Sequence, residues 1–378
     1  MSTLGCFNLD ERPPLDKSSF LIESKHLRPG GQPTISKSTI AVLPVENFSG
    51  VKAPLQQIAK MITSGLKTRG FNLLDEERLE KFRKKHRMRY IGGMSGKLAQ
   101  AIRDEYNVDA CLVTSLEAYR EKYPPQIALI SRLVLSGREP LIVWIDSVGI
   151  TGEDNPGLLG LGRVKKPEKL LARAIDQLLD SLSARPETLQ ADDQRPQTFS
   201  PPTSGRGVSQ RYLPKDFFRS PMIDPRKTYR VAVIPFLNLA MRKNAGQIMA
   251  LHFVKELHRR PNIVIMEPGM VREELLRFRA VMAAGPSLAI SDLISSEHSL
   301  DVDLVLSGKI FTYQGETGTA KVDFSVQAFE KHSREVIYTS KTYCSGDQGV
   351  FFFNFGRVRS AHNLTKEMTR AAVNLMIQ

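Results

Sequence analysis

The sequence is poor in cysteine, with only Cys6, Cys111 and Cys344 in 378 residues. Three cysteines exclude a disulfide scaffold and any zinc or iron–sulfur site built from several cysteines. No apolar run reaches the roughly 18 residues that a transmembrane helix needs, so no such helix is predicted. The seven histidines are scattered without an H-E-x-x-H pattern, and G-x-S-x-G is absent. The sequence therefore indicates no enzyme, no catalytic residues, no cofactor and no metal.

The charge of the chain has one predominant sign. There are 53 Lys and Arg against 40 Asp and Glu, which gives a net charge of +13. Such an excess favours acidic partners, namely nucleic acid, anionic lipid or an acidic glycan. The length predicts two to three domains, and the 41% hydrophobic content is ordinary for a globular protein with buried cores.

An internal repeat organises the chain. TIAVLPVEN at 39–47 matches RVAVIPFLN at 230–238, and Val108-Asp109 matches Val302-Asp303 at nearly the same spacing. Because a spacing of this length is kept over many residues, we interpret the sequence as a tandem duplication.

Each repeat shows the same alternation of patterns. Short apolar runs rich in β-branched residues predict strands, and apolar residues at three- and four-residue spacing predict helices. The predicted fold class is α/β, with two tandem homologous β-α-β-α-β-β-β-α units, each a mixed sheet covered by helices. The main predicted elements are strands at 39–45 and 230–236, at 71–74 and 262–266, and from 108 and 302, a hairpin at 309–313 and 320–329, and final helices at 167–182 and 361–376.

These patterns divide the chain into four parts. Residues 1–36 are predicted to be a flexible N-terminal segment, and 187–227 a Pro/Ser-rich irregular linker. The first α/β domain is predicted at 37–186 and the second at 228–378. We expect each to fold alone when the chain is cut within the linker.

The repeats resemble a family of bacterial envelope domains. The segments that carry the resemblance are IAVLPVENFSG (40–50), GFNLLD (70–75) and NVDACLVTS (107–115), with YRVAVIPFLN and LDVDLVLSGKI in the second repeat. They resemble the α/β domain shared by the curli secretion lipoprotein CsgG, the penicillin-binding-protein activator LpoB and the N-terminal domain of TolB. The resemblance implies a non-enzymatic envelope lipoprotein that assembles or activates other machinery. No counterpart of the membrane-spanning hairpins of the curli pore is present, which argues against a pore.

Leu4-Gly5-Cys6 resembles the end of a lipoprotein signal peptide, in which the cysteine is acylated. Thr3 stands where Leu is usual, and the charged and apolar regions of a signal peptide do not precede it. One interpretation is a lipidated Cys6 with a true start upstream, and the other is a free thiol in a flexible tail.

A basic run at 78–89 predicts a helix with Leu79, Phe82 and His86 directed inward. The candidate site for an anionic lipid or glycan comprises Lys81, Arg83, Lys84, Lys85, Arg87 and Arg89, of which Lys81, Lys84, Lys85 and Arg89 are expected to face outward. The alternative is an ordinary solvated helix face.

Phe351, Phe352, Phe353 and Phe355 form the densest aromatic run and predict a partner contact or additional core. Two glycine-rich stretches are weaker candidates. Gly92–Lys97 departs from the P-loop pattern, and Gly157, Gly160 and Gly162 more simply form a turn. Cys111 and Cys344 are predicted to be buried and inert.

We therefore predict a lipid-anchored protein of the periplasm, held to the outer membrane, that acts through contacts with envelope proteins and with the possibility of homo-oligomers. The alternative is a basic nucleic-acid-binding protein of the cytoplasm, the expected location if Cys6 is not acylated. That alternative lacks a recognisable nucleic-acid-reading motif.

Overall fold

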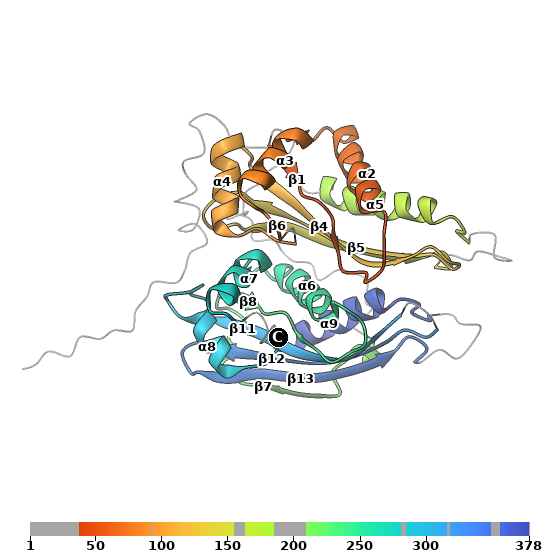
Figure 1. Ribbon diagram of the computed structural model, residues 1–378. Helices are drawn as coiled ribbons and strands as arrows, with labels where there is room; N and C mark the ends of the chain where they lie inside the picture. The colour runs from red at the N-terminus through yellow and green to blue at the C-terminus, as the bar shows by residue number, and fades with distance from the viewer. Residues whose placement is uncertain are drawn as a thin grey trace, which may run out of the picture.

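The computed structural model describes residues 38–377 apart from 91, 155–162, 185–208, 281–284, 316–317 and 349–355. These residues form two mixed sheets with helices on their faces, as Figure 1 shows. The predicted α/β class with two units is confirmed. Within the described residues, no helix is long and apolar enough to cross a membrane.

The first sheet has its strands in the order β3-β1-β4-β5-β6, with β2 beside β4. Its neighbours are parallel up to β4 and antiparallel from β4 to β6, as predicted for a mixed sheet. The strands are β1 (Thr39–Val42), β2 (Glu46–Asn47), β3 (Asn72–Leu73), β4 (Ala110–Arg120), β5 (Gln126–Leu135) and β6 (Ile142–Thr151).

Two helices, α2 (Leu55–Thr68) and α5 (Pro167–Ser183), cover one face of the first sheet. Ile58, Ile62 and Leu66 follow the helical four-residue spacing in α2, and all three are buried. They pack with Leu129 and other apolar side chains of the strands in a core that belongs to this half alone.

The second sheet repeats this order as β10-β8-β11-β12-β13, with β9 beside β11 and one more strand, β7, at the far edge. Two helices, α6 (Ala245–His258) and α9 (Ala361–Ile377), cover one face. The strands are β7 (Asp216–Arg219), β8 (Tyr229–Val233), β9 (Leu237–Asn238), β10 (Ile263–Ile265), β11 (Leu304–Gln314), β12 (Lys321–Glu330) and β13 (Glu335–Ser345).

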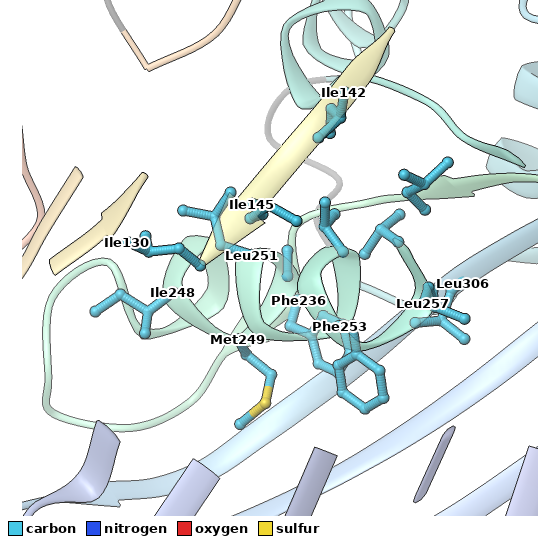
Figure 2. Close-up of a cluster of buried hydrophobic side chains, with 14 of the residues drawn as sticks. Ile130, Ile142, Ile145, Phe236, Ile248, Met249, Leu251, Phe253, Leu257 and Leu306 are labelled. Atoms are coloured by element: carbon cyan, nitrogen blue, oxygen red, sulfur yellow. The ribbon is translucent and has the colours of Figure 1, made fainter. Parts of the chain in front are cut away.

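Helix α6 lies between the two sheets. The sequence predicts a one-sided helix, but twelve of the thirteen residues from Ala245 to Leu257, all except Gln247, are buried. Figure 2 shows the reason. Ile130 and Ile145 of the first sheet lie on the side of Leu251, whereas Phe253 points away from them, toward the strands of the second sheet. We call this region, where α6 and α9 meet the first sheet, the junction.

Two pairs of shorter helices complete the units. The sequence predicts one helical stretch in each, but the structure breaks it into α3 (Glu76–Lys85) and α4 (Gly96–Tyr106), and into α7 (Pro268–Arg277) and α8 (Leu288–Ser295). After α3, Arg87 has a left-handed φ of 48°, which ends the helix.

Part of the predicted linker has regular structure. Strand β7 pairs antiparallel with β13, and a 3-10 turn at Gln210–Tyr212 precedes it. Composition alone missed this strand because Pro214 and Pro221 bracket only a short DFFR run.

Phe253→Ala should destabilise the second unit directly, because Phe253 of α6 packs on Phe236 and Phe324. It should also destabilise the first unit, because α6 shares one buried core with the first sheet. We expect a loss of about 3–5 kcal/mol in the free energy of unfolding. The single tryptophan, Trp144, lies in the first unit and reports on that unit by fluorescence, while circular dichroism reports on the whole chain.

In urea denaturation both signals should shift together, with the exposed Leu276→Ala as the control that moves neither. A fluorescence midpoint that stays at the wild-type value would show that the units unfold independently, which is the expectation from the sequence alone.

Candidate functional site

Three groups of buried ionic side chains join the two units at the junction. Each contains at least one residue from the strands of the first sheet and one from the second unit. Buried charges are costly unless they are paired, so these groups fix how the units meet.

The first group is the ion pair of Arg132 and Glu267, both at most 1% exposed. The guanidinium of Arg132, from the middle of β5, donates two hydrogen bonds to the carboxylate at 2.9 and 2.8 Å and a third to the carbonyl oxygen of Gly92 at 2.6 Å. Glu267 is also the N-cap of α7 and accepts from the backbone N–H of Met94 at 3.2 Å. A bidentate pair of this kind is strong and specific in direction.

Glycines let the backbones of the two units touch beside this pair. A Cβ on Gly93 would lie 2.7 Å from the nitrogen of Gly269, and a Cβ on Gly269 would lie 2.4 Å from the nitrogen of Met94. Gly93 and Gly269 therefore serve the contact between the units. Ser95 accepts a hydrogen bond from Leu98 as the N-cap of α4, so this segment is a helix start rather than a phosphate loop.

Glu46 lies next to Arg132 and is held at an unusual pKa. Burial raises its pKa to about 7, although Arg132 and a hydrogen bond from the Ser115 hydroxyl at 3.2 Å act in the opposite direction. Gly92 leaves room for this carboxylate, since a Cβ there would lie 1.9 Å from a carboxylate oxygen.

The second group consists of Glu117, His252 and His362, each at most 2% exposed. Burial would raise the pKa of Glu117, but the two imidazoles more than offset this and hold it below its usual range. Burial lowers the pKa of His362 to about 4 in spite of the carboxylate beside it. The guanidinium of Arg242 donates to the backbone carbonyl of Glu117 at 2.5 Å.

The third group is centred on Lys255, which is fully buried. Its ammonium group lies 2.9 Å from a carboxylate oxygen of Asp146 and donates to the Ser147 hydroxyl at 2.7 Å. Burial lowers the pKa of Lys255, and the Lys255 charge holds the pKa of Asp146 below its usual value against the effect of burial.

The second sheet has a face directed away from α6 and α9, which corresponds to the face on which the first sheet meets these helices. Helices α7 and α8 cover one end of it, and the rest is open. Lys309, Ser325 and Lys341 are directly paired across β11, β12 and β13, so their side chains form one row. Four large aromatic residues are exposed on these strands and on β7. Phe217 lies on the opposite face, and the other three share the face of this row: Phe218 at 53%, Phe311 at 39% and Tyr343 at 42%. The Lys341 ammonium lies 5.9 Å from the centre of the Phe311 ring. We call the residues Phe218, Lys309, Phe311, Lys341 and Tyr343 the open face.

The basic patch predicted from the sequence lies on α3 and just after it. Leu79 and Phe82 are buried as predicted. Three of its six cations are paired with acids: Lys81 with Glu77, Arg83 with Glu80, and Lys85 with Glu105. No ion pair is found for Lys84, Arg87 or Arg89 among the described residues, so only these remain to attract an anionic partner, which stays a prediction.

Several predicted features lie outside the described residues. These are Cys6, the aromatic run Phe351, Phe352, Phe353 and Phe355, and the glycines at 157, 160 and 162. Cys111 and Cys344 are buried free thiols, as predicted, and burial raises the pKa of Cys111.

Sequence reasoning missed the junction. Glu117 and Arg132 do give a signal, because each is a charge inside an otherwise apolar strand. Nothing in the sequence identifies their partners, since Glu267 and His362 lie 135 and 245 residues away along the chain.

No family model and no curated protein matches the chain. Solved structures that are similar include lipoprotein GNA1162 from Neisseria meningitidis, with 20% identity over 38% of this chain and 99% of that one, at a TM-score of 0.29. Others are the PelC dodecamer from Paraburkholderia phytofirmans (13% identity, 43% and 95% coverage, TM-score 0.29) and the LpoB C-terminal domain from Escherichia coli (17% identity, 34% and 92% coverage, TM-score 0.26). One of these structures is named a lipoprotein, and each is similar to less than half of this chain. Likeness at this level carries no argument about function.

Glu46→Gln should make stability less dependent on pH. The native state holds a proton on Glu46 up to about pH 7, whereas the unfolded chain loses it near its ordinary value. The stabilisation from this proton is therefore present below about pH 4.5 and is lost as the pH rises through about 7. Glutamine mimics the protonated form. The free energy of unfolding of the variant, relative to that of wild type, should therefore rise by about 1–3 kcal/mol when the pH is raised from 5 to 8.

The measurement is urea denaturation at both pH values. Glu139→Gln, at an exposed position in the turn before β6, is the matched control and should show no such gain. An equal effect of Glu46→Gln at pH 5 and pH 8 would contradict the assignment.

Proposed function

We propose that this chain is a non-enzymatic binding or assembly protein of the bacterial cell envelope that acts through protein–protein contacts. The observation that carries the proposal is the open face. The corresponding face of the first sheet is covered by protein, namely α6 and α9, whereas the same face of the second sheet presents aromatic side chains to solvent. Exposed aromatic residues of this kind are enriched where proteins bind one another.

The sequence contains no recognisable catalytic motif, which agrees with a binding role. The three ionic groups are closed into the junction, and the surface hollows on α2 and between α4 and α7 contain none of their residues. A reactive group needs access to a substrate, so these buried pairs suit a structural task better than a catalytic one.

We further infer that the two units arose by duplication, with domains at 37–186 and 228–378, and that they belong to the CsgG, LpoB and TolB type of domain. The support is the repeated motifs together with the matching strand orders of the two sheets. On this basis Cys6 would anchor the chain to the periplasmic side of the outer membrane, with Lys84, Arg87 and Arg89 available to anionic lipid or glycan.

A second candidate is nucleic-acid binding. Aromatic side chains beside lysines on a sheet are also a surface on which bases stack and phosphates bind. The net charge of +13 favours it too. This candidate places the chain in the cytoplasm with Cys6 unmodified.

A photo-reactive amino acid at position 311, introduced in the source cell, should cross-link to one protein of discrete mass in the envelope fraction. Position 60 on the outward side of α2 is the matched control, because Lys60 lines a solvent-exposed surface of the first unit. The same product from both positions, or none from position 311, would contradict protein contact through the open face. A cross-link to RNA or DNA would establish the second candidate.

The anchor is tested by the mass of the native N-terminal peptide from the detergent phase of the source cell. We expect a chain that begins with acylated Cys6. One thioether-linked diacylglycerol and one amide-linked acyl chain on this cysteine would hold the protein firmly in a bilayer. An unmodified Met1 or Ser2 in the aqueous phase would refute the envelope assignment.

A further inference from the structure

Glu117, His252 and His362 meet inside the junction from three different elements. Glu117 comes from β4 of the first unit, and the two histidines come from α6 and α9 of the second. One nitrogen of each ring and a carboxylate oxygen all lie within 4.8 Å of one another. Three potential metal ligands therefore converge where the two units are joined.

The contacts within this triad centre on one atom. The Nε2 atom of His252 lies 3.3 Å from Oε2 of Glu117, and Nδ1 of His362 contacts the same oxygen. The other carboxylate oxygen, Oε1, is buried without a hydrogen-bond partner among the described residues. A buried carboxylate with one oxygen unpaired is costly unless a further positive group is present.

The surrounding backbone is shaped for this triad. Glu117 stands at a register shift between Leu116 and Ala118 of β4, and such a bulge redirects a side chain. Gly149 makes room for His362, because a Cβ there would lie 2.3 Å from its ring. In β11 the matching register shift carries Phe311 instead, which points to solvent. The triad is thus a feature of the junction rather than of the repeated fold.

We propose that Glu117, His252 and His362 bind one divalent transition-metal ion, for which Zn²⁺ is the reference. Two imidazole nitrogens and one carboxylate oxygen suit Zn²⁺, Co²⁺ or Ni²⁺, whereas Mg²⁺ and Ca²⁺ prefer oxygen ligands throughout. A Zn²⁺ ion lies about 2.0–2.2 Å from each donor of this kind. Side-chain rotations that move the two imidazole nitrogens and the carboxylate oxygen by about an ångström would bring them around the ion. Oε1 of Glu117 is available as a fourth donor.

The ion would have a structural role. It would offset the buried negative charge and tie β4 of the first unit to α6 and α9 of the second. Because the triad is closed to solvent, the ion enters while the junction forms and then exchanges slowly. This inference does not depend on the proposed function, since it concerns the joining of the two units.

The test uses the full chain, unfolded in urea with a chelator and refolded with equimolar Zn²⁺ or Co²⁺. After passage over a chelating resin, wild type should retain one ion per chain by elemental mass spectrometry. It should also melt at a higher temperature than protein refolded without metal, because an ion bound only to the native state stabilises it. The Co²⁺ form should show visible absorption bands of nitrogen and oxygen coordination.

His252→Gln and His362→Gln should each weaken binding by more than the roughly 10- to 100-fold that follows the loss of a group that only orients a ligand. His86→Gln is the matched control, because His86 also pairs with a glutamate, Glu105 at 2.7 Å, but lies outside the junction. Wild-type protein that refolds and retains no ion would overturn the proposal and leave the triad as a hydrogen-bonded contact. Full retention by a folded His252→Gln variant would overturn it as well. If the variants fail to fold, the number of metal ions retained per wild-type chain tests the proposal by itself.

Discussion

Helix α6 is buried on all sides because it lies between two sheets, and the rest of the structure depends on this placement. A helix in that position needs apolar residues on both sides, which is why Leu251 and Phe253 can point in opposite directions and still be buried. It also carries His252 and Lys255 into a region without solvent. Each of these polar groups is satisfied only by a partner on the first sheet, so charge pairing selects one arrangement of the two units.

The two units share a strand order, but the corresponding faces of their sheets have different surroundings. In the first sheet, the face that bears Glu117 and Arg132 is closed by the second unit. In the second sheet, the same face bears Phe311 and Lys341, and the part that carries them is open. The outward side of α2, with Gln57 and Lys60, has none of the apolar character of α6, so the stack of alternating sheets and helices ends there.

Local patterns in the sequence were enough to predict the fold class and most elements. Pro44 and Pro235 each stand two residues after the last residue of the first strand of their unit, and Pro167 and Ala361 begin the last helices as predicted. Strand β7 was not predicted because its place comes from pairing with β13, which the local sequence does not encode. The candidate site was missed for the same reason. An isolated glutamate or arginine in a strand shows that something must neutralise it, but the partner is set by tertiary packing.

The junction and the open face are linked through the strands that separate them. Side chains alternate along β11, so Ile310 packs inward toward α6 and its neighbour Phe311 points outward. A partner that binds the open face therefore rests on strands whose other side is held by α6 and α9. The triad of Glu117, His252 and His362 fixes these two helices to the first sheet. A firm junction thus keeps the second sheet in one shape, which lowers the entropy that a partner must overcome when it binds.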